Sequence, residues 1–445
     1  MLRRIRLLRR SEAPRAVAWG FADQLLSSAT NLFLFVLAGR VLGPDGLGIV
    51  FIGFSSYLAI LGLQRALLTD PLVALTSAAP RSERVRATRS CLTWALMASS
   101  AGSVLLGTVG ATTPGDIGRG LLLFAPCVLP ALAQDFWRTV LFRDQRPRAA
   151  TLNDGIWLAV MTASLPAAWL LQADWAVVAC WGAGAVASAV AGFMQTRTWP
   201  WRPAAAWLWW RREAWPFGNW LAVNSVVYGL GSYATIFALA TLLGTKALGG
   251  LRAVESVFAP LSLVAPALTL PGLPALARSL AASPREAQRL AGRLGATAAA
   301  LSVVYVLSLG LGAGRLVPFI FGPSFSGFTA IVWPVGIAQV LTAASIGFGL
   351  LLKAQRRGRA LLIAGSAGSA ASLVLATALA WTVGLTGAAW GLAAGSAIGA
   401  LALTAAARQG GGVDHVRDPR MPRARSGRLA GFARIVSQQP EHPGS

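Results

Sequence analysis

The stretch Leu42-Gly43-Pro44-Asp45-Gly46-Leu47-Gly48 lies between two long apolar segments, residues 17–38 and 47–68. Each segment has 22 residues. A helix rises about 1.5 Å per residue, so each would measure about 33 Å, enough to cross a hydrocarbon core of about 30 Å. Glycine, proline and aspartate end helices and turn chains. The sequence therefore predicts a transmembrane helical hairpin with Gly43, Pro44 and Gly46 at its turn.

The pattern Leu-Gly, three residues, Leu-Gly recurs 201 residues later, in Leu243-Gly244-Thr245-Lys246-Ala247-Leu248-Gly249. This stretch also lies between two apolar segments, residues 219–242 and 250–271. A match of leucines and glycines is weak by itself in a chain rich in both. Its placement at the same kind of turn favours an internal duplication. Gly244 and Gly249 are then the turn residues of the second hairpin.

The composition excludes an ordinary soluble protein. Of 445 residues, 55% are hydrophobic and 12% are charged, which is too little polar surface to face water on all sides. The net charge of +23 is spread over clusters between the apolar segments, a pattern typical of membrane topology and not of a nucleic-acid surface. The three cysteines lie in different segments, and we interpret them as packing residues.

Twelve apolar segments can be drawn, and lysine and arginine alternate between their two sides. One side, which includes both chain ends, carries 33 of the 39 basic residues, the other carries five, and Arg65 lies within a segment. Basic residues concentrate on the cytoplasmic side of membrane proteins. The sequence therefore predicts an all-α, multi-pass protein of the cytoplasmic membrane with both termini cytoplasmic. The predicted spans are residues 17–38, 47–68, 91–110, 118–137, 151–171, 175–195, 216–242, 250–271, 294–312, 327–352, 360–381 and 386–407.

Three segments lie outside the two predicted lobes, residues 17–195 and 216–407. Residues 196–215 carry six tryptophans and four arginines, which predicts a linker along the membrane interface, with sugar stacking as the alternative. Residues 1–16 are predicted as a basic cytoplasmic tail on anionic lipid. Residues 408–445, rich in glycine, proline and arginine, are predicted as a disordered basic cytoplasmic tail.

The residues needed for most enzymes are missing from the predicted spans. The two histidines, His415 and His442, lie in the C-terminal tail, which excludes a histidine-based catalytic or metal site within the membrane. The chain has no Asp-x-Asp pair and no phosphate-binding glycine loop before a basic helix. We therefore expect no enzymatic activity, no cofactor and no metal.

Charged residues within membrane spans are costly, so they indicate sites. They fall in two groups, Asp23, Arg65, Asp70, Asp135 and Arg138 in the first half and Arg252 with Glu255 in the second. Asn224 matches Asp23 at the 201-residue offset. Pro260, Pro266, Pro271 and Pro274 predict a bent or broken helix near residues 250–271.

Two interpretations of these charges stay open. Arg138 and Asp70, near the ends of spans, favour ion pairs or contact with headgroups. Asp23, Arg65, Arg252 and Glu255 favour a water-filled cavity. A cavity with arginines would suit an anionic, phosphate-bearing substrate, because guanidinium binds phosphate through charge-assisted bidentate hydrogen bonds.

Several stretches resemble a known family. Residues 23–48 resemble the opening "ar-LG-x4-G" motif of polysaccharide flippases, the Wzx-like branch of the multidrug/oligosaccharidyl-lipid/polysaccharide (MOP) exporter superfamily. Four further stretches are similar to the pattern of the same family: Leu243-Gly244 with Gly249, the proline-rich end of the predicted span 250–271, residues 317–325 and residues 384–389. The resemblance covers nearly the whole membrane domain.

The resemblance implies two pseudo-symmetric six-helix lobes around a central cavity that opens alternately to each side. It implies transport of a polyprenyl-diphosphate-linked oligosaccharide or polysaccharide precursor. Lipid II flippases of the superfamily hold the diphosphate with cavity arginines, for which Arg65 and Arg252 are the candidates here, with Asp23, Glu255, Asn224 and Arg138 as further cavity residues. Ion coupling, common in the superfamily, would fall to Asp23, Asp70, Asp135 or Glu255.

Two other functions stay open. One is a drug/cation antiporter of the same superfamily, which would need more buried acids than arginines facing its cavity. The other is a scaffold for polysaccharide-synthesis enzymes that does not transport. The expected partners are a lipid-linked saccharide, anionic membrane lipids and, in the scaffold case above all, other polysaccharide-assembly proteins. No nucleic acid is expected.

Overall fold

The computed structural model describes residues 2–77 and 79–409, and its described side chains begin at Ala18. Within these ranges the chain is helical throughout, with no strand. The predicted C-terminal tail lies outside the described residues, except for Arg408 and Gln409 at the end of the last helix. The predicted N-terminal tail is described by its backbone alone, which is the start of the first helix.

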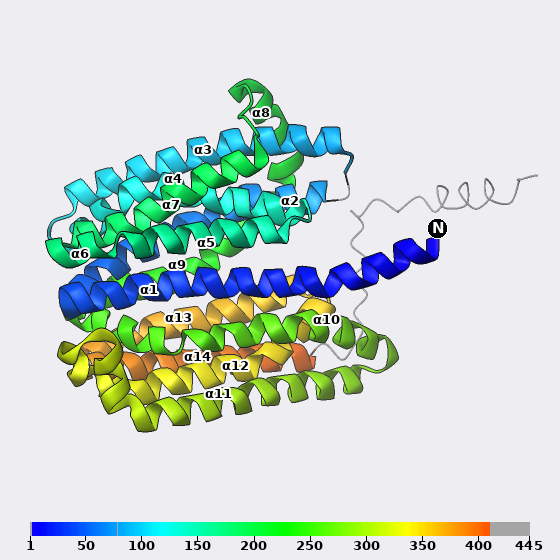
Figure 1. The fold of residues 1–445 in the computed structure, drawn as a ribbon. Helices are drawn as coiled ribbons and strands as arrows, with labels where there is room; N and C mark the ends of the chain where they lie inside the picture. Colours follow the sequence, from blue (N-terminus) through cyan, green and yellow to red (C-terminus); the bar gives the residue numbers. More distant parts are fainter. Residues whose placement is uncertain (1, 78, 410–445) are drawn as a thin grey trace, which may run out of the picture. The chain divides into compact units, whose positions relative to one another are not determined.

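The helices follow the predicted spans in order (Figure 1). Short π-helical (η1, η2) and 3-10 (η3, η4) turns separate some of them. The elements are α1 (Leu2–Gln64), η1 (Arg65–Thr69), α2 (Asp70–Thr76), α3 (Arg81–Thr112), α4 (Gly115–Arg143), α5 (Pro147–Ala163), α6 (Leu165–Leu171), α7 (Asp174–Thr196), α8 (Pro203–Trp209), η2 (Trp210–Ala214), α9 (Trp215–Val257), η3 (Ala259–Leu263), α10 (Val264–Ala282), α11 (Pro284–Phe321), η4 (Pro323–Ile331), α12 (Val332–Ala354), α13 (Gly358–Val383) and α14 (Leu385–Gln409).

The first hairpin turns at one residue. Gly43 has φ 73° and ψ −169°, a conformation that suits glycine, and it breaks α1 into two arms. The next residue, Pro44, begins the second arm. A backbone N–H has no partner within the helix at this position, so proline costs no hydrogen bond there. The rings of Phe35 and Phe54 lie 5.0 Å apart, although an unbroken helix would separate them by about 28 Å. The arms therefore fold back on each other, and the turn is much tighter than the seven-residue stretch predicted.

The second hairpin repeats this geometry. Gly244, 201 residues after Gly43, has φ 78° and ψ 172° and breaks α9 in the same way. The two turns also contact each other reciprocally. A Cβ on Gly48 would collide with the Thr245 carbonyl oxygen, and a Cβ on Gly249 would collide with the Pro44 carbonyl oxygen. Gly249 and Thr245 are the 201-offset equivalents of Gly48 and Pro44, so the contact has the self-complementary form of a two-fold axis.

The candidate membrane spans number ten among the described helices, or up to eleven if the bent pair of residues 259–282 is one span. Two of the ten, Ala18–Thr76 and Leu221–Val257, contain the turning glycines. Eleven of the twelve predicted segments fall within these helices to within a few residues, and the segment 250–271 runs from the end of α9 through η3 into α10. The proline-rich segment is broken, as predicted, by η3 and by a bend of 41° near residue 270.

The helices form two lobes that meet along α1 and α9. We call α1 to α7 the N-lobe and α9 to α14 the C-lobe. In Figure 1, α3, α4, α5 and α7 lie above α1 and α10 to α14 lie below it, in agreement with the packing of α4, α5 and α7 on one another and of α11 on α12. The predicted linker holds α8 and η2, and the rings of Trp207 in α8 and Trp210 in η2 pack against Trp94 of α3, each with a centroid distance of 5.4 Å. Its interfacial position stays a prediction.

Candidate transport cavities

The N-lobe encloses a polar cavity of about 230 Å³ between α1, α4, α5 and α7. Its lining includes Gln24, Ser27 and Asn31, which lie three and four residues apart on α1 and so share one face of that helix. Arg65, Gln134, Asp135, Arg138 and Asp154 line the same space. The N-lobe cavity thus gathers most of the charged groups that the first half of the chain carries within its predicted spans.

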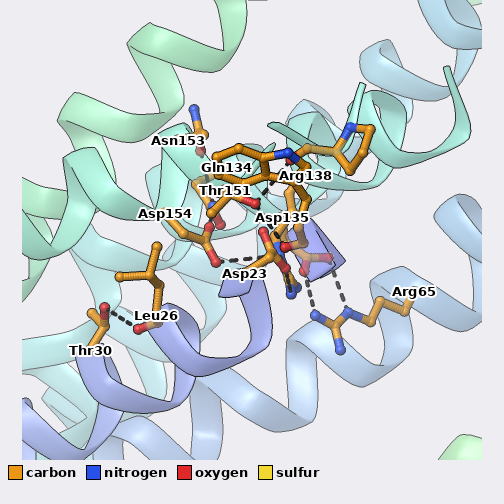
Figure 2. A network of polar contacts seen from close by, with 12 residues as sticks. Asp23, Leu26, Thr30, Arg65, Gln134, Asp135, Arg138, Thr151, Asn153 and Asp154 are labelled. Atoms are coloured by element: carbon orange, nitrogen blue, oxygen red, sulfur yellow. Dashed lines mark hydrogen bonds and ion pairs between the residues drawn. The ribbon is translucent and has the colours of Figure 1, made fainter. Parts of the chain in front are cut away.

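Arg138 of α4 joins three helices (Figure 2). Its Nε donates to Asp23 Oδ2 of α1 at 2.9 Å, its Nη2 donates to the same oxygen, and Asp154 Oδ2 of α5 lies 3.4 Å from Nε. The side chains of Arg138 and Asp23 are 18% and 1% exposed. Burying such charges is costly, and the loss is recovered only when each charge has a close, hydrogen-bonded partner. For Arg138, near the end of a span, ion pairs or headgroup contact were expected, and the structure shows the ion pairs.

Arg65 forms the second ion pair of the N-lobe cavity. Its Nε donates to Asp135 Oδ2 at 3.1 Å and its Nη2 donates to Oδ1, which is bidentate geometry across α4 and η1. The Arg65 side chain is 44% exposed, whereas Asp135 is 5% exposed. Asp135 and Arg138 share a face of α4, as their spacing predicts, but each pairs with a different helix. The carboxylate therefore orients a guanidinium that still faces open space.

Three residues of the network were not singled out from the sequence. Gln134 Nε2 donates to Asp154 Oδ1 at 2.7 Å and to Asn153 Oδ1 at 3.1 Å, and Asn153 Nδ2 donates to the Ser188 carbonyl oxygen. The available signal was the polar pair Asn153-Asp154 at the start of an apolar span.

Several buried polar atoms around the N-lobe cavity make no hydrogen bond to the described residues. They are Asp23 Oδ1 and the indole nitrogens of Trp157 and Trp181. A buried donor or acceptor without a partner costs free energy, so such groups are normally satisfied by water or by a ligand. The cavity is thus polar enough to hold water.

The C-lobe encloses a larger cavity of about 770 Å³ between α9, α10, α12, α13 and α14. Its lining is mostly leucine, glycine, serine and threonine, and its ionisable residues are Glu255 and Lys353. On α12 (342–353), α13 (361–372) and α14 (392–403) the lining residues run over twelve positions each, and the eleven rises between the ends correspond to a length of about 16 Å. Phe51 is the contribution of the N-lobe.

The other candidate residues lie apart from the N-lobe network. Arg252 donates to Glu255 at 3.3 Å and lies over the rings of Phe35 and Phe51, outside the residues that line either cavity. Asp70 is exposed at the start of α2 and lines neither cavity. Asn224 lies in α9, and its side chain is outside the described residues.

Known proteins resemble this chain in fold and not in sequence. No protein-family model matches it, and no curated protein matches it by sequence. Lipid II flippase MurJ in an inward closed conformation has a TM-score of 0.68 at 12% identity, over 87% of this chain and 86% of the flippase. An inward-facing MATE-family multidrug resistance transporter of the MOP superfamily has a TM-score of 0.65 at 12% identity, over 88% and 97% of the two chains. A MOP-superfamily transporter from Pyrococcus furiosus, described as having a binding pocket of reverse polarity, has a TM-score of 0.61 at 12% identity, over 88% and 94%.

These likenesses cover 87–88% of this chain. The identities are too low to assign a branch or a substrate. The chain is an all-helical, multi-pass membrane protein with the fold of the MOP-superfamily transporters.

Proposed function

We propose that this protein is a flippase that moves a polyprenyl-diphosphate-linked oligosaccharide or polysaccharide precursor across the cytoplasmic membrane by alternating access. The observation that carries the proposal is the setting of Arg65. Its guanidinium lines the N-lobe cavity, is held by Asp135 and remains 44% exposed. A fixed, solvated guanidinium is suited to a diphosphate, because it offers further N–H donors without first having to be ordered.

The C-lobe cavity supports the amphiphilic character of the substrate. It is about 770 Å³ in volume and lined by leucines together with hydroxyl-bearing side chains such as Ser232, Thr235 and Ser369. Such a lining suits a hydrocarbon chain or an uncharged sugar better than a second charged group. A charged N-lobe cavity beside an apolar C-lobe cavity therefore fits a molecule with an anionic head and an apolar or uncharged remainder.

Lipid II flippase MurJ is named for a lipid-linked substrate and shares this fold. That likeness supports a lipid-linked substrate for this chain, and it leaves the glycan to experiment.

A cation antiporter is the second candidate, and one observation favours it. The N-lobe cavity network has three carboxylates, Asp23, Asp135 and Asp154, for two guanidiniums. An excess of buried acid can bind a proton or a cation, and MATE transporters share the fold. In a flippase the same carboxylates, Asp23 and Asp135 foremost, would serve ion coupling.

The test uses the purified protein in liposomes with a fluorescent polyprenyl-diphosphate-linked monosaccharide and an impermeant quencher. We expect Arg65→Ala to slow translocation at least about tenfold, because it removes a charge-assisted contact to phosphate. Arg65→Lys should recover part of the rate. Arg119→Ala is the matched control, since Arg119 pairs with Asp174 at 2.5 Å, is 60% exposed and lines neither cavity.

Three outcomes separate the candidates. Translocation that is equal in Arg65→Ala and in the parent protein would exclude the diphosphate role of Arg65. Uptake of a cationic dye driven by a proton or sodium gradient, without movement of the lipid, would establish the antiporter. In cells, loss of polysaccharide export on removal of residues 410–445 combined with full export by Arg65→Ala would support the scaffold.

A further inference from the structure

The two lobes touch at the end of the molecule where both hairpins turn, which we call the turn end. The contact is backbone to backbone. Gly48 faces the carbonyl of Thr245 and Gly249 faces the carbonyl of Pro44, so closely that no side chain fits at either glycine. The hydroxyl of Thr245, itself buried, lies 3.1 Å from Asp116 Oδ2 and 3.4 Å from Asp45 Oδ1, both of the N-lobe.

Arg40 ties the N-lobe to the C-lobe at the same end. It lies three residues before the Gly43 turn, and its Nε donates to the carbonyl oxygen of Ile320 at 2.8 Å. Its Nη2 donates to the carbonyl oxygen of Phe319. Both acceptors belong to the last turn of α11, where carbonyl groups lack partners within the helix and the helix dipole attracts a cation. These hydrogen bonds exist only while the lobes are together.

Arg252 makes the converse contact, from the C-lobe to the N-lobe. Its guanidinium carbon lies 4.2 Å from the ring centre of Phe35 and 4.9 Å from that of Phe51, one on each arm of α1. Its Nε is buried and makes no hydrogen bond to the described residues. The aromatic faces stabilise the cation in place of water. Separation of the lobes would return this guanidinium to solvent.

We propose that these contacts form the gate at the turn end, with Arg40 and Arg252 as its two cross-lobe latches. Each arginine belongs to one lobe and makes contacts with the other, although Arg252 also pairs with Glu255 of its own lobe. Opening the turn end breaks both cross-lobe contacts at once, which leaves Arg40 without its carbonyl partners and Arg252 with Glu255 alone at the mouth that opens. Opening of the gate would thus expose positive charge that the closed state covers, and the exposed charge would attract an anionic headgroup. The last step rests on the proposed function, whereas the gate itself does not.

The experiment measures closure without any substrate. A single reporter cysteine, Thr245→Cys, is placed in a chain with Cys91, Cys127 and Cys180 replaced by alanine. The rate of labelling by an impermeant maleimide is followed on both faces of membrane vesicles. Thr245 is 7% exposed, so the reporter should label slowly in the parent protein.

We expect Arg40→Ala to raise the labelling rate about tenfold, because it removes charge-assisted hydrogen bonds that only the closed state makes. Gly249→Val should raise it at least as much, since its side chain cannot coexist with the Pro44 carbonyl. Phe51→Leu should raise it about threefold through loss of one cation–π contact. Arg119→Ala removes an arginine at the same end whose partner, Asp174, lies within the N-lobe, and it should label as the parent does.

The gate is refuted if Arg40→Ala labels as slowly as the parent while size exclusion and thermal unfolding show a folded protein. An equal rise in Arg119→Ala would also refute it, because the effect would then be loosening of the N-lobe. A rise in labelling in Arg40→Ala together with no lipid movement by the parent protein in the liposome assay would keep the gate and reject the flippase.

Discussion

The N-lobe and C-lobe cavities arise from related halves of one chain, yet they differ in chemistry. The N-lobe cavity is small and lined by two arginines and two aspartates, and Asp23 pairs with one of those arginines. The C-lobe cavity is more than three times as large, and its ionisable residues are Glu255 and Lys353. Asp23 and Asn224 occupy equivalent positions in the two halves. The two hairpins share one backbone conformation at Gly43 and Gly244, while the interiors of the two lobes differ in charge.

The difference separates two uses of interior space. Buried ion pairs hold helices in a particular register, because each charge is costly unless its partner stays in place. An apolar wall with hydroxyl groups imposes no such constraint and accepts ligands of varied shape. We therefore expect the N-lobe to be sensitive to loss of single charges and the C-lobe to be sensitive to side-chain volume.

The largest expected effect comes from breaking the N-lobe network. Arg138→Ala should lower the free energy of unfolding by about 3–5 kcal/mol, because Asp23 and Asp154 would be left buried without their cation. Thermal or denaturant unfolding in detergent measures the loss. Lys353→Ala, in the exposed wall of the C-lobe cavity, is the comparison and should change stability by less than about 0.5 kcal/mol. Equal losses in the two variants would remove the contrast between the lobes.

A smaller effect is expected from crowding the C-lobe helices. A Cβ on Gly391 of α14 would lie 2.5 Å from Ala376 Cα of α13, so Gly391→Val should cost about 1–3 kcal/mol. The same unfolding measurement applies. Stability equal to the parent would mean that α13 and α14 can move apart, which contradicts volume-sensitive packing.

The smallest effect has the opposite sign. Gly349 of α12 lines the C-lobe cavity, and a Cβ there would meet nothing within 4 Å. Gly349→Ala should therefore raise the free energy of unfolding by about 0.5–1 kcal/mol through the lower entropy of the unfolded chain. Gly349→Leu should fold normally and slow translocation in the liposome assay by filling the cavity. Destabilisation by alanine would show that this wall is already packed.

Much of the fold was predictable because it follows from local rules. The apolar segments, the alternation of basic residues and the two Leu-Gly turns predicted a helical membrane protein with two related hairpins. The turning glycines lie where they were predicted, and Gly43 and Gly244 share one backbone conformation. Pairing was harder to predict. Asp23, Arg65, Asp135 and Arg138 do meet, but Asp70 lies outside, and Asp154 of α5, which was not predicted as a site residue, joins them.

One cavity lies among the N-lobe helices and a larger one lies among the C-lobe helices with Phe51 of the N-lobe in its wall, and the expected central cavity stays a prediction. Arg252 illustrates why the surroundings of a charged residue could not be predicted from sequence spacing alone. Its neighbour Glu255, three residues away, does pair with it, as helical geometry requires. Its contact with Phe35 and Phe51 depends on how two hairpins more than 200 residues apart come together.

The sequence by itself determined that this protein lies in a membrane, where its helices are and where its two similar hairpins turn. Hydropathy, charge alternation and glycine conformation determine these features because they act over a few residues. The tertiary structure alone decided which charges meet, which arginine faces a cavity and which is held between aromatic rings. Those outcomes depend on the packing of distant helices, where a shift of one turn gives a side chain a different neighbour. Local sequence patterns therefore do not predict which distant helices pack together.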